Sequence, residues 1–444
     1  MSKKKKFRPL RFILGTIFIL LGVVVLVLGS YVGYISLTYY RIGDIHLQVL
    51  NNQTTKIAAG DIGIKEFKIT TYNVGFGAYD RDYSFFMDVS EFKQEYIESQ
   101  GNKDNTGDRA HGASKAQVIT NITGAYDTIV NLGDLDFMLY QEVDTKSTRS
   151  YKIDQYSIGN EKHVDYGKFI GLNYHSAYLA YPFHEPIGQS NSGITTYSKY
   201  KIDSAERREF KITDSFFGKF FDLDRCFTIS EIPIDGSAKK LYIFNVHMSA
   251  YDAAGIIRKV QLEQLKAAIT VARDYDGNNN YVVVGGDFNH DLVIDNPLVN
   301  DAYKDNIFNK QETAILTTDW YNYLRLDPSK HGTRAVNLIS GMEEDYVYDF
   351  KDMHLTSHGP VNIGTCRDAS IPFVDKNNNG IVDNAMVSID GFLVSDNISV
   401  TEIKTIGSGA GLQTETLPAS DPRYGLGFVY SDHNPVFMSF KLLV

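Results

Sequence analysis

Asp287 and Asn289 stand directly behind an apolar, β-branched run near the middle of the chain. The run from Tyr281 to Val284 indicates a buried strand, and the two glycines after it permit a sharp turn and the close approach of a ligand. Strands that deliver polar groups at their C-terminal ends build the active sites of α/β proteins. The alternative is an Asp/Asn-rich turn that only closes a strand, and the rest of the chain has to distinguish the two.

Other polar strand ends follow the same pattern. Four strand-like segments end in or enclose a polar group, and a polar segment opens a last strand: 66–77, 136–144, 240–249, 386–395 and 431–443. The candidate site residues collected in this way are Asn73, Glu142, His247, Asp287, Asn289, Asp390, Asp432 and His433. One such Glu is usually solvated and one such His usually packs in a core, but six sites arranged alike favour a shared function.

The carboxylates and amides in this set suit a metal-assisted reaction on phosphate. Mg²⁺ is held by one or two carboxylates together with substrate phosphate, and a bound cation stabilises charge that builds on a phosphoryl oxygen. Glu142 is the first ligand candidate, followed by Asp390 and Asp432. Asn73 and Asn289 could donate hydrogen bonds to ligands or to a developing oxyanion.

The two histidines suit proton transfer or phosphate binding. A carboxylate beside an imidazole raises the histidine pKa and fixes its tautomer. His433, paired in this way, could hold the phosphate or serve as the base. His247 could be the acid for the leaving group.

Six short motifs carry a family resemblance. They are T-Y-N-V-G (71–75), Q-E-V (141–143), N-V-H (245–247), G-D-F-N (286–289), D-G-F-L-V-S (390–395) and S-D-H-N-P-V (431–436). In order and rough spacing the set resembles the endonuclease/exonuclease/phosphatase superfamily, in a membrane-anchored, bacterial-type form. That family includes deoxyribonuclease I-like nucleases, neutral sphingomyelinases and inositol polyphosphate 5-phosphatases. The resemblance covers most of residues 66–444, and the residues between Asn289 and Asp390 match no part of the family pattern.

The resemblance implies a four-layer α/β sandwich, in which two packed mixed sheets are flanked by helices. It also implies cleavage of a phosphoester by an activated water with Mg²⁺ or Mn²⁺. The implied metal ligands are Glu142, Asn73 and Asp432. The implied catalytic residues are His433, polarised by Asp390; Asp287, which orients or deprotonates the water; Asn289, which stabilises the transition state; and His247.

The remaining sequence predicts the elements that must position these residues. Helices are expected at 114–130, with Ser114 as N-cap, and at 256–272. The other expected segments are a polar surface insertion at 78–113, loops with a short hairpin at 145–190, a short strand at 193–198 and a loop at 404–428. Residues 66–444 contain no internal repeat and no second composition block, so we expect one catalytic domain there.

The N-terminus predicts a membrane anchor. A basic tail at 1–11 precedes an uncharged run at 12–40, which is long enough for the roughly 20 apolar residues of a spanning helix. Basic residues stay on the cytoplasmic side, so we expect a single-pass protein of the cell membrane. The N-terminus would be cytoplasmic, a juxtamembrane connector would occupy 41–65, and the catalytic domain would be extracytoplasmic. A cleaved signal peptide is the alternative, although the run exceeds a usual apolar region of about 7–15 residues.

The charge and the cysteine content limit the kinds of ligand that the protein is expected to bind. Seven of the 44 Lys and Arg residues lie at or before Arg41, together with none of the 54 Asp and Glu, so the rest of the chain has a net charge of −17. Such a surface gives no electrostatic basis for non-specific nucleic-acid binding, and it suits divalent cations. Cys226 and Cys366 could pair in an oxidising compartment, but two cysteines without clustered histidines do not fit a zinc site.

One further motif is a candidate calcium loop. Its oxygens would come from Asp375, Asn377, Asn379 and Asp383, with glycine at position 6. Position 12, where a bidentate Glu belongs, is Met386, and an Asx-rich turn is the alternative.

The sequence therefore predicts a metal-dependent phosphoesterase outside the membrane. Its substrate would be a phosphodiester of nucleic acid or of a phospholipid head group, and a sphingomyelinase-like phospholipase competes with a nuclease. The alternative from another class is a catalytically silent surface-binding protein on the same scaffold. No protein partner can be inferred.

Overall fold

The computed structural model describes residues 9–87, 107–212, 224–250, 256–289 and 354–444. The last range has gaps at 357–358, 363, 368, 375–383, 385, 388, 409–412, 414–415 and 422. The candidate calcium ligands Asp375, Asn377, Asn379 and Asp383 lie outside the described residues.

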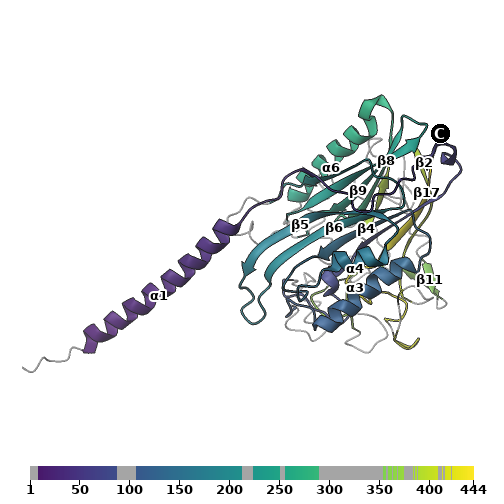
Figure 1. The fold of residues 1–444 in the computed structure, drawn as a ribbon. Helices are drawn as coiled ribbons and strands as arrows, with labels where there is room; N and C mark the ends of the chain where they lie inside the picture. The colour runs from purple at the N-terminus through teal and green to yellow at the C-terminus, as the bar shows by residue number, and fades with distance from the viewer. Residues whose placement is uncertain are drawn as a thin grey trace, which may run out of the picture.

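Two mixed sheets form the centre of the domain (Figure 1). The first has the order β1 (Ile45–His46), β7 (Ser204–Glu209), β8 (Cys226–Asp235), β9 (Lys240–His247), β10 (Tyr281–Asp287) and β15 (Asp390–Val394), with β2 (Ile57–Ala58) beside β8. The second has the order β16 (Ile398–Thr405), β17 (Val436–Leu442), β3 (Phe67–Asn73), β4 (Phe137–Asp144), β6 (Gly188–Ser198) and β5 (Gly167–Leu179). Parallel pairs, β9 with β10 and β3 with β4, lie at the middle of each sheet.

Among the described residues, two short antiparallel pairs lie outside these sheets. They are β11 (His354–Thr356) with β12 (Gly359–Asn362), and β13 (Cys366–Arg367) with β14 (Met386–Val387).

Apolar side chains from both sheets fill the space between them. Phe67, Leu139, Phe244 and Val284 are buried in one cluster that joins the two inner faces. Helix α6 (Ile256–Asp274) adds Leu265 to this cluster from the outer side of the first sheet.

Two helices cover the outer side of the second sheet. Helix α3 (Lys115–Val130) buries Ile122 and Ile129 with Tyr72 and Tyr140, and α4 (Gln155–Lys162) lies beside it. The layers therefore run helix, sheet, sheet, helix, and the predicted four-layer α/β sandwich is confirmed. Ser114 caps α3 as expected, because its side chain accepts a hydrogen bond from the backbone of Gln117.

Several irregular segments are more ordered than their sequences indicated. Strands β5 and β6 form a hairpin of 13 and 11 residues, where loops with a short hairpin and then a short strand were expected. The described ends of the expected surface insertion bury Tyr79 and Tyr83. The expected strand 386–395 is divided into β14 and β15, so Asp390 begins a strand instead of lying inside one.

An apolar helix projects from the domain at the N-terminus (Figure 1). It is α1 (Pro9–Thr38), and its segment Phe12–Thr38 is long and apolar enough to cross a membrane. A signal sequence would meet the same criterion.

Candidate active site

Strand register brings the polar strand ends of the first sheet into one row. Asp287, the last residue of β10, pairs with His247 at the end of β9 on one side and with Asp390 at the start of β15 on the other. In the second sheet, Asn73 ends β3 opposite Gln141 of β4, one residue before Glu142. Parallel neighbours end at the same edge, so each sheet presents its polar groups at one edge.

Asp287 joins the two sheets. Its Oδ2 accepts a hydrogen bond from Asn73 Nδ2 at 2.9 Å, and its Oδ1 accepts one from the backbone N of Asn289 at 2.8 Å. Only glycine fits at position 286 beside Asp287. Its φ is +150°, and a Cβ there would lie 2.0 Å from the backbone oxygen of Val246. Gly285 and Gly286 both lie inside β10, so the strand continues to Asp287 where a sharp turn was expected, and Gly286 serves the close packing of β9 and β10.

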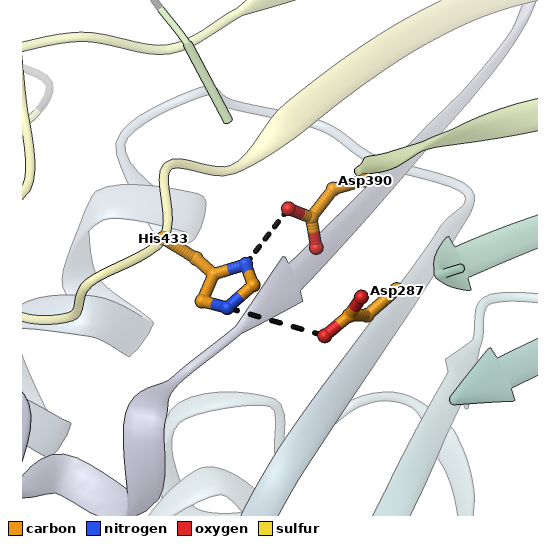
Figure 2. A group of neighbouring side chains, drawn as sticks. All are labelled: Asp287, Asp390 and His433. Atoms are coloured by element: carbon orange, nitrogen blue, oxygen red, sulfur yellow. Dashed lines mark hydrogen bonds and ion pairs between the residues drawn. The ribbon is translucent and has the colours of Figure 1, made fainter. Parts of the chain in front are cut away.

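His433 and Asp390 form a buried pair (Figure 2). His433 Nδ1 lies 2.8 Å from Asp390 Oδ2, and His433 Nε2 points toward Asp287 Oδ2 at 3.9 Å. The first distance is that of a hydrogen bond and the second is too long for one. The three residues come from β10, β15 and the segment before β17, so the pair depends on contacts between both sheets.

This pairing favours a protonated imidazole. Burial alone would lower the pKa of His433, but the charge and hydrogen bond of Asp390, together with the neighbouring Cys366, outweigh burial and raise it well above its usual value. Burial raises the pKa of Asp390 to about 6 although His433 opposes that shift. His433 is therefore better suited to hold a phosphoryl oxygen than to act as a base.

The surroundings of His247, unlike those of His433, favour a neutral imidazole. Burial, followed by the charges of Arg225 and His433, lowers the pKa of His247 well below its usual value. Its Nε2 lies 3.5 Å from Asp287 Oδ2 and 3.7 Å from Glu142 Oε1, yet both contacts exceed hydrogen-bond length and do not offset burial. A neutral ring does not suit the acid role considered from the sequence.

Asn173 contacts His247 and was missed by sequence reasoning. Its Nδ2 lies 3.2 Å from His247 Nδ1. An amide donor makes Nδ1 the acceptor, so the imidazole proton is placed on Nε2, which faces the carboxylates. Asn173 lies inside β5 at a register shift, and no local pattern in the sequence marks it.

Glu142 occupies a strained position at a β-bulge. The ladder between β4 and β6 shifts register between Tyr140 and Val143, and Glu142 has a φ of 60°. A non-glycine residue in this region costs about 1–3 kcal/mol and is characteristic of functional sites, and bulges re-aim side chains. Burial and then the charge of Asp432 raise the pKa of Glu142 to about 8.

Asp432 approaches the same place from the segment before β17. Ser431 Oγ donates its one proton to the backbone oxygen of Asn73 at 2.8 Å, and Asp432 Oδ1 lies 3.3 Å from the same hydroxyl oxygen. Gly75 allows this approach: its φ is +52°, and a Cβ there would lie 2.8 Å from Ser431 Oγ and 3.0 Å from Asp432 Oδ1. Burial raises the pKa of Asp432.

These oxygens fit a hard divalent cation. Glu142 and Asp432 are close enough for the charge of one to raise the pKa of the other, which is the situation that a bound cation relieves. Asn73 Oδ1 accepts a hydrogen bond from the backbone of Gly75 at 3.0 Å and has a second lone pair. Oxygen-only donors of this kind match Mg²⁺ or Mn²⁺.

A second group within the described residues also has the spacing of metal ligands. Asp287, Asp390 and His433 have ligand atoms within 4.8 Å of one another. The two nitrogens of His433 face the two carboxylates, as Figure 2 shows, so this group already balances one cationic ring against its anions. The carboxylates of Glu142 and Asp432 are therefore the better candidates for a metal ion.

Hydrogen bonds to neighbouring residues hold both the side chain and the backbone of Asn289 in place. Its φ is 47°, and its side-chain Nδ2 donates to the backbone oxygen of Met248 at 2.9 Å. Its backbone oxygen accepts a hydrogen bond from Arg258. The amide group carries a second N–H, which remains the candidate donor to a transition state.

Both cysteines are free and lie beside the two site histidines. Cys226 pairs with His247 across β8 and β9, and Cys366 forms an isolated β-bridge with His433. The pairing considered from the sequence is absent from the structure. Burial raises the pKa of Cys366 to about 12, so its thiol is protonated beside His433.

Comparisons with known proteins give similarity at the level of solved structures. No family model and no curated protein matches the chain. An endonuclease/exonuclease/phosphatase from Beutenbergia cavernae is 13% identical, with a TM-score of 0.43, over 85% of this chain and 72% of that chain. A protein of the same description from Bacteroides vulgatus is 15% identical, with a TM-score of 0.40, over 85% and 99%.

A third similar structure is ANGEL2, described as a 2',3'-cyclic phosphatase. It is 14% identical, with a TM-score of 0.44, over 90% of this chain and 99% of that chain. The first two of these structures carry the description of the family that the six sequence motifs resemble.

Proposed function

We propose that the chain is a divalent-metal-dependent hydrolase of phosphoester bonds, and that phosphodiesters are its preferred substrates. One observation carries the proposal: two carboxylates, Glu142 and Asp432, and the buried His433–Asp390 pair all lie close to Asp287, which joins the two sheets. The two carboxylates suit a cation, and the imidazolium suits a phosphate oxygen.

The residues divide the reaction between them. His433, kept protonated by Asp390, binds a phosphoryl oxygen through Nε2. Asp287 orients the attacking water and accepts its proton, and the amide of Asn289 stabilises the developing charge. Hydrolysis bonds the water oxygen to phosphorus, breaks one phosphorus–oxygen ester bond and places a proton on the departing oxygen.

Glu142, Asp432 and Asn73 would hold the metal ion. The ion would polarise a phosphoryl oxygen and neutralise charge in the transition state. His247, neutral and carrying its proton on Nε2, faces the carboxylates of Glu142 and Asp287 at 3.7 and 3.5 Å, where it would donate to one of them once substrate and metal draw the groups together.

The cellular placement is part of the proposal. Helix α1 would cross the membrane once with its basic N-terminal end in the cytoplasm, and the domain would lie outside. Fractionation of the full chain and protease accessibility of intact cells would check both points.

The test is hydrolysis of bis-p-nitrophenyl phosphate by the full chain with Mg²⁺, Mn²⁺ or Ca²⁺, each with an EDTA control. Glu142→Gln should weaken metal activation, and His433→Ala should lower kcat at saturating metal by about 100-fold or more. Glu161→Gln, on the exposed side of α4, is the matched control and should retain full activity.

A chain that hydrolyses none of bis-p-nitrophenyl phosphate, DNA, RNA or sphingomyelin with any of these metals would support the catalytically silent alternative. Retention of most activity by His433→Ala would contradict the role given to that residue.

A further inference from the structure

A row of aromatic rings connects the candidate site to the tip of the β5–β6 hairpin. The aromatic ladder, as we call it, consists of Phe76, Tyr79, Tyr83, Phe85, Phe86, Tyr181 and Phe183. Successive ring centroids are separated by 5.5, 4.4, 6.5, 5.1, 5.8 and 6.0 Å. These are the distances of packed aromatic pairs, so the ladder is continuous from one end to the other.

The two ends of the ladder differ in exposure. Phe76 lies three residues after Asn73, is buried, and packs against the guanidinium of Arg149. At the other end, Tyr181 is 53% exposed and Phe183 is 87% exposed. Neighbouring exposed aromatic side chains at a hairpin tip are typical of an interaction surface.

Helix α1 is attached to this hairpin. The hydroxyl of Tyr31 accepts a hydrogen bond from the backbone N of Ala180 at 2.9 Å and donates to the backbone oxygen of Tyr178 at 3.3 Å. The hydroxyl of Tyr34 accepts one from the backbone N of Tyr178 at 3.3 Å. The hairpin tip therefore lies beside the last turns of α1, as Figure 1 shows.

The depth of the tip follows from the composition of α1. The helix is uncharged and mostly apolar from Phe12 to Leu28 and carries Tyr31 and Tyr34 in its last two turns, as spanning helices do at the membrane–water interface. If α1 crosses a bilayer, Tyr31 and Tyr34 lie at that interface. The hairpin residues hydrogen-bonded to them, and the exposed rings of Tyr181 and Phe183 just beyond, lie at the same level.

The direction of the strands places the site at this end of the domain. Strand β5 and strand β4 are both antiparallel to β6, and β3 is parallel to β4. The C-terminal ends of all three therefore point the same way. Asn73 and Glu142 stand at the same edge of the sheet as the hairpin that contacts α1.

From these contacts we infer that the exposed end of the aromatic ladder docks into the bilayer that α1 crosses. The phosphoester bond that the site cleaves then belongs to the head group of a lipid in that bilayer. The substrate part of this inference rests on the function proposed above. Tyrosine and phenylalanine suit the boundary between head groups and acyl chains. The net charge of −17 outside the anchor also opposes long nucleic acids.

The docking is tested with the full chain in phosphatidylcholine vesicles, with and without brominated acyl chains. Phe183→Trp should lose about half of its fluorescence to the brominated lipid. Tyr275→Trp is the matched control, because Tyr275 is 48% exposed at the opposite edge, before β10 begins. The unsubstituted chain, with its single Trp320, gives the background. Equal quenching of the two variants would overturn the docking.

The substrate class is tested by release of phosphocholine from vesicles of phosphatidylcholine and sphingomyelin. Tyr181→Ser combined with Phe183→Ser should lower this release about tenfold and leave hydrolysis of soluble bis-p-nitrophenyl phosphate unchanged, whereas Tyr275→Ser should change neither. A parallel loss of both activities in the double variant would contradict docking as the cause.

The two proposals fail in different ways. A chain that cleaves bis-p-nitrophenyl phosphate or DNA but neither lipid would overturn the lipid substrate and leave the phosphoesterase proposal intact. A chain without any hydrolysis would overturn the proposed function and the lipid substrate together, while the quenching result would still decide the docking.

Discussion

At the scale of single residues, Glu142 shows how the backbone serves the site. A φ of 60° is unfavourable for a glutamate, and burial beside Asp432 disfavours its charged form. Both effects weaken the folded state in the absence of a cation. A residue that is unfavourable for stability in two ways indicates a position selected for binding.

Replacement of Glu142 by glycine should therefore stabilise the metal-free chain and inactivate it. Glycine adopts positive φ without strain, and the buried carboxylate is removed, so we expect a gain of about 1 kcal/mol in the free energy of unfolding. Urea denaturation in EDTA measures this, alongside bis-p-nitrophenyl phosphate hydrolysis with Mg²⁺.

Asp276→Gly is the control for this change. Asp276 has a φ of 55° in an exposed turn after α6, so its replacement should stabilise the chain without loss of activity. A Glu142→Gly variant that is less stable than the parent would show that the position is not strained.

At the scale of elements, the close packing of β9 and β10 depends on Gly286. A methyl group there would collide with the backbone of Val246, which cannot move without displacing His247 from Asp287. Gly286→Ala should therefore cost about 3 kcal/mol or more of unfolding free energy.

Gly236→Ala separates this collision from backbone strain. Gly236 also has a positive φ, +73°, but the nearest atom to its added Cβ lies 4.0 Å away. Its replacement should cost only about 1 kcal/mol. Urea denaturation of both variants gives the comparison, and equal costs would mean that the strands separate easily.

A second prediction for the elements concerns pH and the contact of α4 with the second sheet. Burial, followed by the charges of Lys168 and Lys162, lowers the pKa of His163 to about 3. Its Nε2 lies 2.7 Å from the hydroxyl of Tyr140. In the unfolded chain the His163 imidazole takes up a proton near pH 6.5, whereas in the folded chain it stays neutral until about pH 3. The free energy of unfolding must therefore fall as the pH drops from about 6.5 toward 3.

The slope assigned to His163 is about 1.4 kcal/mol for each pH unit in that window. Urea denaturation between pH 7 and pH 4 should show a shallower loss for His163→Gln than for the parent chain. His46→Gln, which alters an exposed ring, should follow the parent. Parallel curves for all three proteins would exclude His163 as a source of acid sensitivity.

The strands also show which parts of the fold and of the candidate site could be predicted from the sequence and which could not. Asn73, Glu142, His247 and Asp287 became candidates because each lies at or near the C-terminal end of an apolar strand, and strand direction alone brings such ends together. Asn173 was missed because an amide inside a strand has no local signature, and its contact with His247 spans 74 positions. The full length of the β5–β6 hairpin was not predicted, because apolar and polar residues alternate only weakly in these segments. Packing against neighbouring strands, and not the local sequence, stabilises such strands.

At the scale of the whole molecule, helix α1 and the candidate site lie at the same end of the domain. If α1 crosses a membrane as proposed, its attachment to the β5–β6 hairpin through Tyr31 and Tyr34 fixes which edge of the sandwich faces that membrane. A tether without this attachment would hold the domain near the bilayer in any orientation. Orientation, and not proximity alone, is therefore the property that these tyrosines contribute.

Removal of the two hydroxyls should separate orientation from proximity. In proteoliposomes, Tyr31→Phe combined with Tyr34→Phe should leave the chain in the membrane and its hydrolysis of bis-p-nitrophenyl phosphate unchanged. Hydrolysis of lipid in the same vesicles should fall about threefold to tenfold, because three hydrogen bonds of about 0.5–1.5 kcal/mol each no longer hold the catalytic edge against the surface. Tyr275→Phe, at the opposite edge, is the control. Unchanged lipid hydrolysis in the double variant would mean that the hairpin orients the domain without help from α1.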